Sequence, residues 1–192
     1  MSLITENTGK LASGYSEIHK DIIELSKEGD SKAQYRLYKL YSKAMFNICF
    51  RMMNNREEAE DMLQESFSDA FLRLDSFRYE SSFGAWIKQI VVNKCINEIK
   101  RRKADVVLFE DMTPFDDHDD EKYNEDDIKL EVEKVRKAID DLPDGFRIIF
   151  TLYLMEGYDH TEIAQILGIS ESTSKTQYMR AKKKLKQLLI QQ

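Results

Sequence analysis

Residues 159–189 read DHTEIAQILGISESTSKTQYMRAKKKLKQLL and decide the fold of the C-terminal part of the chain. Asp159 followed by Glu162 is the pattern of a capping box at a helix start, and Gly168 suits the left-handed residue that ends a helix. Ser170 then caps a second helix, which makes the whole pattern typical of a helix-turn-helix. The residues spaced for the inner faces are Ile163, Ala164 and Leu167 in the first helix, and Ser174, Tyr178, Ala181, Leu185 and Leu188 in the second.

The second helix of this motif is basic and has no acidic residue after Glu171. Polar side chains at its start suit the base edges of a major groove, and lysines further along suit phosphates. A basic helix by itself is as often an ordinary solvent-exposed surface helix as a DNA-binding helix. The capped helix and the turn before it favour DNA binding. The outer faces carry Thr173, Lys175, Gln177, Arg180, Lys182, Lys183, Lys184 and Lys186.

The net charge of -6 is unevenly distributed along the chain. Residues 104–131 contain twelve acidic and two basic side chains, whereas residues 1–103 and 132–192 each have a balance of +2. The negative net charge of the whole chain is therefore no argument against DNA binding by residues 1–103 or 132–192. So many like charges with few apolar residues predict a mobile linker between two compact units, residues 21–103 and 132–192, after a tail of residues 1–20. A solvated spacer is the simpler interpretation of the linker, and a segment that lies in a basic channel or masks the DNA-binding faces is the alternative.

Other features of the sequence limit the possible classes of function. Cys49 and Cys95 lie in apolar helical patterns without a ligand-like histidine nearby, so we expect buried, reduced thiols and neither a metal site nor a cofactor. No apolar run approaches membrane-spanning length and the first residues lack a signal-peptide pattern, so a cytoplasmic protein without direct membrane insertion is expected. His19, His118 and His160 fall in separate segments, and no phosphate loop or nucleophile motif is present, so no enzyme is expected.

The N-terminal half has helical periodicity from residue 31 to residue 103, so we expect an all-α protein. Three helices are predicted, over residues 32–53, 56–74 and 82–102. Their predicted inward residues are Leu37, Leu40, Ala44 and Ile48 in the first, Ala59, Met62, Leu63, Phe67, Ala70, Phe71 and Leu74 in the second, and Phe83, Ile87, Ile90, Val91 and Ile99 in the third.

The second of these helices bears an acidic stripe at three- and four-residue spacing, formed by Glu57, Asp61, Gln64 and Glu65. Acidic side chains favour a helix N-terminus, which accounts for Glu57 and for Glu58 beside it. It accounts less well for Asp61 and Glu65, which are therefore candidates for binding another protein.

The third helix has a polar, cationic face, and Trp86 lies two turns before its first residue, Asn93. The preceding loop, FRYESS at residues 77–82, adds aromatic rings and hydroxyls. An unstacked, single-stranded base needs a ring to stack on and donors for its edge, and this combination supplies both. A tryptophan on an amphipathic helix is more often part of the core, so both interpretations of Trp86 remain open. The polar face consists of Asn93, Asn97, Lys100 and Arg101.

Two parts of the chain resemble one family. Residues 58–74, EAEDMLQESFSDAFLRL, and 77–102, FRYESSFGAWIKQIVVNKCINEIKRR, resemble conserved region 2 of bacterial sigma factors. Residues 142–189, which begin LPDGFRIIFTLYLMEGYDHTEIAQILGIS, resemble region 4. The direct linker, without a region-3 domain, is similar to the extracytoplasmic-function (ECF) group of the sigma-70 family. The resemblance implies a monomeric, non-enzymatic promoter-specificity subunit that binds core RNA polymerase, at its β′ clamp and β subunit, and promoter DNA in duplex and melted form.

The resemblance also implies a role for each surface. Asp61, Gln64 and Glu65 match the helix that docks on the β′ clamp, and the acidic linker would thread toward the RNA exit region. An anti-sigma factor is a further expected partner. The residues that match the elements opening the −10 promoter element and capturing a flipped base are Tyr79, Glu80, Ser81, Ser82, Phe83, Trp86, Asn93, Asn97, Lys100 and Arg101. Those that match the helix reading the −35 element are Ser170, Ser172, Thr173, Lys175, Thr176, Gln177, Arg180 and Lys183.

The helix-turn-helix departs from the family pattern at several positions. The family often has glycine at 172, an aliphatic residue at 174 and leucine at 178, where this chain has Ser172, Ser174 and Tyr178. Ser174 on the inner face costs apolar burial, but its hydroxyl can bond back to a backbone carbonyl, and Tyr178 can compensate by bulk. Gln177 stands where many members have arginine and is a candidate for contact with adenine.

A helix-turn-helix regulator with a LuxR-like output domain is the alternative function, because it shares the ILGIS pattern. A response regulator of that kind needs an N-terminal receiver with alternating strands and helices and a phosphoacceptor aspartate. Residues 1–103 show no strand alternation, which favours the sigma factor.

Overall fold

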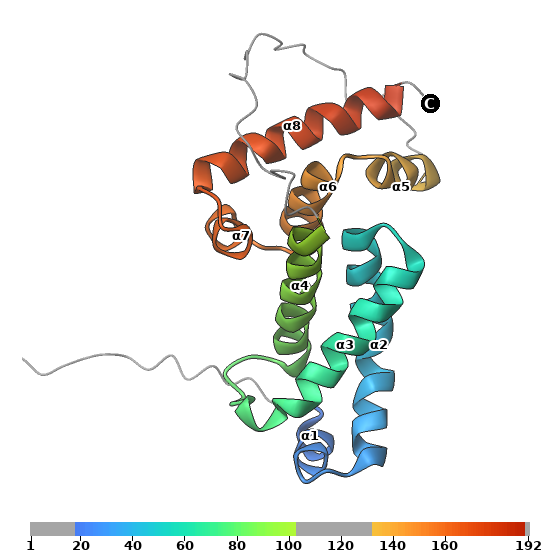
Figure 1. Cartoon of the computed structure of the whole chain (residues 1–192), viewed down its shortest axis with the longest axis vertical. Coiled ribbons are helices and arrows are strands. Elements are labelled where there is room, and N and C mark those ends of the chain that lie inside the picture. The colour runs from blue at the N-terminus through green and yellow to red at the C-terminus, as the bar shows by residue number, and fades with distance from the viewer. Residues whose placement is uncertain (1–17, 103–131, 191–192) are drawn as a thin grey trace, which may run out of the picture.

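The computed structural model describes residues 18–102 and 132–190, and all regular structure in these residues is helical (Figure 1). This confirms the expected all-α fold; the predicted linker and most of the predicted tail lie outside the described residues. The N-terminal unit consists of α1 (Lys20–Lys27), α2 (Ser31–Met53), α3 (Arg56–Leu72), the 3-10 turn η1 (Leu74–Ser76) and α4 (Phe83–Arg102). The C-terminal unit consists of α5 (Val132–Asp140), α6 (Asp144–Phe150), the π-helical segment η3 (Thr151–Met155), α7 (His160–Leu167) and α8 (Glu171–Ile190).

Short polar residues set the limits of the long helices. The side chain of Asp30 accepts hydrogen bonds from the backbone N–H groups of Lys32 and Ala33, at 2.7 and 3.1 Å, and so begins α2. Asn54 ends α2 in the left-handed conformation, with φ 54°. Asn55 then caps α3, which reverses the direction of the chain and lets α3 pack along α2.

The inner face of α2 differs from the prediction. Leu40 is 50% exposed and Ala44 is also exposed, so the predicted inward positions of these two residues are wrong. Tyr41 and Met45 pack inward instead, and Tyr41 meets the ring of Phe83 edge-on with centroids 5.0 Å apart. The prediction placed the next inward residue three positions after Leu37, at Leu40. The structure places it four positions after Leu37, at Tyr41. The stripe that packs inward is Leu37, Tyr41, Met45, Ile48 and Met52.

The two cysteines face each other in the core of the N-terminal unit. Cys49 on α2 and Cys95 on α4 are free and buried, which confirms the expected burial of both thiols. A hydrogen bond with Cys49, together with burial, raises the pKa of the Cys95 thiol. The buried Cys95 thiol is therefore not a candidate nucleophile.

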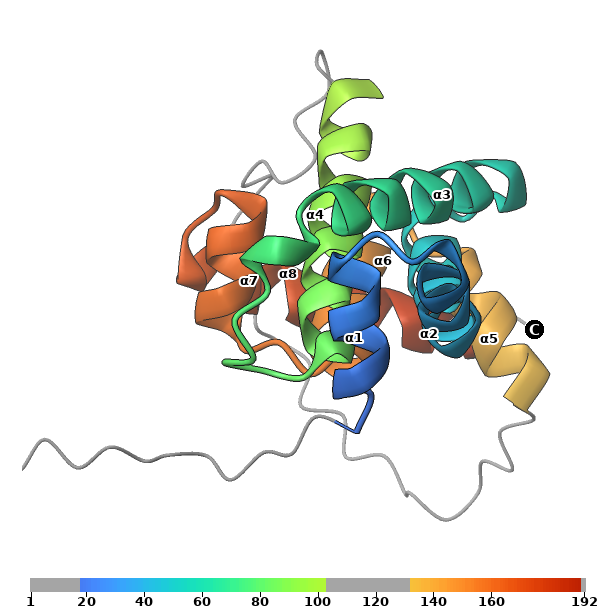
Figure 2. The same cartoon turned by 90° about the horizontal axis from the view of Figure 1, so that it is seen from below.

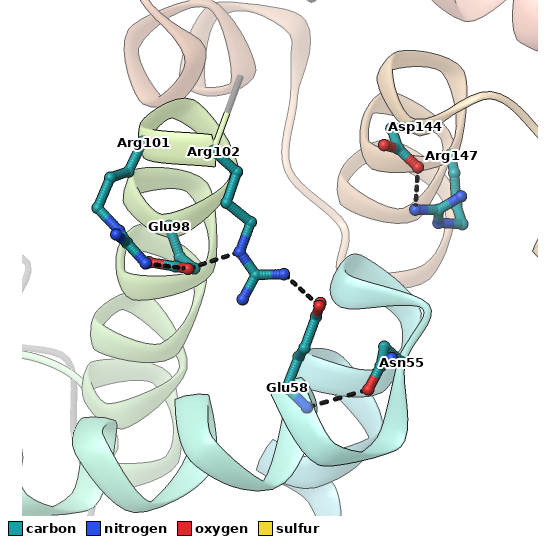
Figure 3. Close-up of polar contacts among 7 residues, drawn as sticks. All are labelled: Asn55, Glu58, Glu98, Arg101, Arg102, Asp144 and Arg147. Carbon is teal, nitrogen blue, oxygen red and sulfur yellow. Dashed lines mark hydrogen bonds and ion pairs between the residues drawn. The ribbon is translucent and has the colours of Figure 1, made fainter. Parts of the chain in front are cut away.

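A buried arginine closes the corner between α5 and α6. The guanidinium of Arg147 donates to the carbonyl oxygen of Leu142 at 2.9 Å. It also donates to the carboxylate of Asp144 at 2.5 Å (Figure 3). A buried cation needs such partners to offset its lost hydration. The pair fixes the start of α6, the helix against which α8 packs.

The two units pack against each other along a contact that we call the seam. Helix α2 contacts α6, and α4 contacts α7. Both views show α7 beside α4 (Figures 1 and 2). The main buried cluster continues from the N-terminal helices into the C-terminal unit. A smaller cluster around Leu142, Phe150 and Ala181 belongs to the C-terminal unit. The C-terminal residues in the main cluster are Ile148, Ile149, Leu152, Ile163 and Leu167.

Glu156 is the polar centre of the seam. Its side chain is only 7% exposed, forms an ion pair with Arg51 of α2, and lies 4.0 Å from the Nζ of Lys88 on α4. Lys88 also donates to the backbone carbonyl of Glu156 at 2.9 Å and lies 5.0 Å from the centre of the Tyr158 ring. Asn54 donates to the carbonyl of Asp140 at 3.0 Å, which adds a second polar contact between the units. Two cations thus compensate one buried carboxylate.

Candidate nucleic-acid and protein interfaces

The acidic stripe on α3 is accessible. Asp61, Gln64 and Glu65 are all exposed, and α3 holds them on one face. Lys94 of α4 borders the stripe, with its Nζ 3.4 Å from the carboxylate of Glu65 and 2.7 Å from that of Asp69. The hydrogen bond to Asp69 raises the pKa of Lys94, so this cation stays charged and partly balances Glu65. The uncompensated end of the stripe therefore lies toward Asp61.

The loop before α4 is held by α1, a helix that the sequence analysis did not predict. Tyr79 has φ 60°, an uncommon conformation for a bulky residue. Its hydroxyl donates to Glu24 of α1, and this hydrogen bond lowers the pKa of the Glu24 carboxyl. The Nζ of Lys27 lies 4.7 Å from the centre of the Tyr79 ring. Helix α1 thus fixes the aromatic residue of the loop, while Glu80 and Ser81 remain exposed.

Trp86 lies at the start of α4 on an aromatic base. Its ring packs against Phe77 and Phe83, with centroids 5.3 and 5.6 Å away, and it keeps partial exposure. Phe83 itself is 0% exposed, so its predicted contact with −10 DNA is wrong. Phe83 supports Trp86 from the core instead. Ser82 caps α4 by accepting a hydrogen bond from the N–H of Ala85 at 3.0 Å.

The polar face of α4 is brought together as predicted from its spacing, with Asn93, Asn97 and Lys100 exposed. Arg101 lies at its end and donates two hydrogen bonds of 2.8 Å to Glu98 (Figure 3). These bonds from Arg101, with a further one from Arg102, lower the pKa of Glu98 to about 2. Glu98 is therefore ionised at neutral pH, and Arg101 must exchange this carboxylate for a phosphate to bind DNA.

Arg102 anchors the same end of α4 to α3. It donates to Glu98 at 2.6 Å and forms an ion pair with Glu58, whose own N–H is bonded to the cap residue Asn55 (Figure 3). The polar face of α4 is thus tied to the helix that carries the acidic stripe.

Helices α7 and α8 form the predicted helix-turn-helix. Asp159 and Glu162 make both hydrogen bonds of the capping box, each of 2.8 Å. Gly168 ends α7 with φ 73°, a left-handed conformation that suits glycine. The hydroxyl of Ser170 accepts from the N–H of Thr173 at 3.0 Å and begins α8. All three local signals in this stretch are confirmed.

The candidate DNA-reading residues of α8 do not all face outward. Gln177 is only 6% exposed, so its predicted outer position is wrong. It lies three residues after Ser174 and four before Ala181, and all three are buried on the inner side of α8. Lys175 is exposed but pairs with Glu171 at 2.6 Å. Of the remaining candidates, Ser170, Ser172 and Lys183 are exposed, and Thr173, Thr176 and Arg180 are partly buried.

Ser174 also differs from expectation. Its hydroxyl lies 2.9 Å from Nδ1 of His160, so its polar partner is a side chain of α7 instead of a backbone carbonyl of α8. Tyr178 fills space as expected, with its ring centroid 4.4 Å from that of Tyr153 and 6.3 Å from that of Phe150. The sequence analysis missed His160; the polar residue at position 174 was the signal that a partner existed.

Known proteins resemble this arrangement in both halves. The model of sigma-70 region 2 matches residues 37–104, and that of sigma-70 region 4 matches residues 133–185, together more than half of the chain. ECF RNA polymerase sigma factor SigW of Bacillus subtilis is 29% identical over 179 residues, which cover 88% of this chain and 96% of that protein. The chain belongs to the ECF group of the sigma-70 family. In this ECF chain the region 2 match begins within α2 and takes in α3 and α4, and the region 4 match runs through α5 to α8.

Two solved structures share the fold of this ECF chain. The sigma factor RpoE from Bartonella quintana, in complex with the anti-sigma factor NepR, aligns over 81% of this chain and 95% of its own, with a TM-score of 0.53 and 22% identity. CnrH, in complex with the cytosolic domain of CnrY, aligns over 89% and 96%, with a TM-score of 0.52 and 22% identity. At this level of identity the likeness establishes the fold.

The family is one of non-catalytic transcription initiation factors. Within the described parts of this ECF chain, no helix is both long and apolar enough to cross a membrane. No group of His, Cys, Asp and Glu suited to a metal ion occurs among the same residues.

Proposed function

We propose that this chain is the promoter-specificity subunit of bacterial RNA polymerase, which binds the core enzyme, recognises the −35 and −10 elements and promotes DNA opening. The presence of region 2 and region 4 in one chain is the observation that carries the proposal. A regulator with a LuxR-like output domain would place a receiver of strands and helices before the helix-turn-helix. Residues 18–102 instead form a helical unit with an exposed acidic stripe.

Each surface has a separate task in this proposal. Asp61, Gln64 and Glu65 dock on the β′ clamp. The partly exposed Trp86 offers a ring for stacking, and the amides of Asn93 and Asn97 offer hydrogen bonds to the edge of an unpaired base. Phe83 acts by supporting Trp86. Contacts to the −10 region further include Tyr79, Glu80, Ser81, Ser82, Lys100 and Arg101, and contacts to the −35 element include Ser170, Ser172, Thr173, Lys175, Thr176, Arg180 and Lys183.

The place of action and the control of the protein follow from the same proposal. A subunit of RNA polymerase acts in the cytoplasm, where the core enzyme and the promoter are. We propose that an anti-sigma factor restrains it, and the complex of RpoE with NepR supports this because RpoE shares the fold.

The closed seam is incompatible with simultaneous contact to both promoter elements. Lys100 Nζ lies 3.8 Å from the position that a Cβ atom on Gly168 would occupy. The polar face of α4 therefore adjoins the helix-turn-helix. Elements about 25 base pairs apart are separated by ~85 Å of duplex at about 3.4 Å per base pair. A compact chain of this length has a radius of gyration of only about 16 Å. The seam must therefore open when the promoter is engaged.

Glu156→Gln should shift the protein toward the open arrangement. The substitution leaves Arg51 and Lys88 facing a neutral group, and hydrogen bonds to charged partners contribute about 1.5–3 kcal/mol. The open fraction should rise roughly tenfold to a hundredfold. Energy transfer between dyes at Lys39→Cys and Gln187→Cys, two exposed positions in different units, reports the opening. Affinity for promoter DNA in the presence of core polymerase should also increase, because a larger fraction of the protein is already open.

Glu60→Gln is the matched control for this experiment. Glu60 also pairs with an arginine, Arg56, at 2.9 Å, but within α3 and with its side chain 46% exposed. It should leave the energy transfer unchanged. If Glu156→Gln behaves like this control, the ion pairs of Glu156 do not hold the units together.

Sequence selection from fragmented genomic DNA distinguishes the two functions. With core polymerase present, the chain should enrich fragments that share two short motifs at a fixed spacing. Without polymerase, enrichment should be weak. Strong selection of a single motif by the chain alone would instead support the helix-turn-helix regulator.

A further inference from the structure

A buried hydroxyl lies at the heart of the helix-turn-helix. Ser174, the fourth residue of α8, is 0% exposed, at a position where aliphatic residues are common in the family. A buried hydroxyl without a hydrogen-bonding partner is destabilising. Here the partner is Nδ1 of His160, 2.9 Å away in the first turn of α7. The bond therefore joins the two helices of the motif directly.

The imidazole of His160 is itself held in place by two tyrosines. It stacks on the ring of Tyr153 in η3, with centroids 4.5 Å apart and an interplanar angle of 16°. It meets Tyr178 of α8 edge-on at 5.7 Å. Burial, together with the charge of nearby Lys175, lowers the pKa of His160, so the ring is neutral at neutral pH. A neutral ring with a fixed plane presents Nδ1 to Ser174 in one direction.

This bond constrains α8 more tightly than an apolar contact could. Packing between aliphatic side chains tolerates small rotations of a helix, whereas a hydrogen bond weakens steeply as its angle departs from linearity. Ser174 stands between Thr173 and Lys175, two candidate DNA contacts. A second polar bridge, from the hydroxyl of Thr161 to Glu171 at 3.2 Å, ties the same two helices at the start of α8. A rotation of α8 would therefore move Thr173 and Lys175 together.

We propose that His160 is a positioning residue for −35 recognition, which sets the rotation of α8 about its axis through Ser174. The proposal rests on the proposed function and adds a residue that touches no DNA. It also joins the departures at positions 174 and 178 into one cluster, because Ser174 bonds His160 and the imidazole packs against Tyr153 and Tyr178.

The test uses holoenzyme assembled from core polymerase and four variants: His160→Leu, His160→Gln, Ser174→Val, and His160→Leu combined with Ser174→Val. Each is titrated with a duplex carrying the −35 sequence that the unmodified protein selects, and with a scrambled duplex. His160→Leu leaves the Ser174 hydroxyl without its partner and should lower the ratio of selected to scrambled affinity about tenfold. His160→Gln, whose amide can bond the hydroxyl, should retain most of the ratio. The double variant should return to within about twofold of the unmodified protein, because replacing both partners by apolar groups can be nearly neutral.

His19→Leu is the matched control, since His19 Nδ1 bonds the hydroxyl of Tyr41 at 3.0 Å in the N-terminal unit. It should leave the ratio unchanged. Circular dichroism at the titration temperature verifies that each variant is folded. The proposal is overturned if His160→Leu keeps the ratio, if it weakens both duplexes equally, or if the double variant is no better than His160→Leu. If the unmodified holoenzyme prefers no duplex, the proposed function itself fails, which is a separate result.

Discussion

Asp61→Lys combined with Glu65→Lys should abolish binding of the chain to core RNA polymerase. Both carboxylates are exposed on α3. A partner surface that binds them by charge complementarity would be cationic, so reversal replaces attraction by repulsion. At position 65 the new lysine also faces Lys94, whose Nζ lies 3.4 Å from the native carboxylate. We expect a loss of about a hundredfold or more, which corresponds to ~3 kcal/mol. Competition with the unmodified chain for a limiting amount of core enzyme measures it.

The control is a second double charge reversal in the same unit. Glu28→Lys with Asp75→Lys changes the net charge equally, and both residues are exposed outside α3. This variant should bind core enzyme normally, while the far-UV spectrum and melting temperature of both variants stay close to those of the native chain. Normal competition by the α3 variant would show that the stripe is not the docking surface.

Asn93→Ala should reduce promoter opening while leaving −35 duplex binding intact. Asn93 is exposed on the polar face of α4, two turns from Trp86, and its amide can bond the edge of an unpaired base. Loss of such hydrogen bonds costs about 1–3 kcal/mol, so open complexes should become roughly tenfold to a hundredfold fewer. Permanganate footprinting of unpaired thymines measures this population. Ser82→Ala is a less specific probe, because Ser82 also caps α4.

A template with a preformed bubble separates base capture from other causes. Its bases are already unstacked, so it should recover part of the loss caused by Asn93→Ala. Asn47→Ala removes an exposed amide from α2 instead and should behave like the native chain on both templates. An equal defect of Asn93→Ala on duplex and bubble templates would assign Asn93 to the fold or to polymerase contact.

The features predicted correctly from the sequence depend on neighbours in the chain. The capping box at Asp159, the left-handed Gly168 and the cap at Ser170 are encoded within a few residues, and so is the spacing of the acidic stripe on α3. Helical periodicity also gave most of the buried residues of α3 and α4. It failed in α2 at Leu40 and Ala44, because the apolar residues of that helix allow two stripes.

The features that the sequence did not reveal depend on contacts between distant segments. Nothing in the sequence distinguishes Glu156 from an exposed acidic residue. In the structure Arg51 and Lys88 lie beside its carboxylate. Gln177 reads as an outer residue, yet it shares the buried side of α8 with Ser174. His160 looks like a solvated residue beside a cap until the fold brings Tyr153, Ser174 and Tyr178 around its ring. Periodicity cannot assign such partners, since it describes one helix at a time.

Run-off transcription tests the central claim most directly. Core RNA polymerase, with and without the purified chain, is supplied with the genomic fragments that the pair selects. The account predicts discrete transcripts that appear only with the chain and start at a fixed distance downstream of the two shared motifs. Absence of chain-dependent transcripts, while the chain still binds those fragments, would contradict its assignment as a sigma factor.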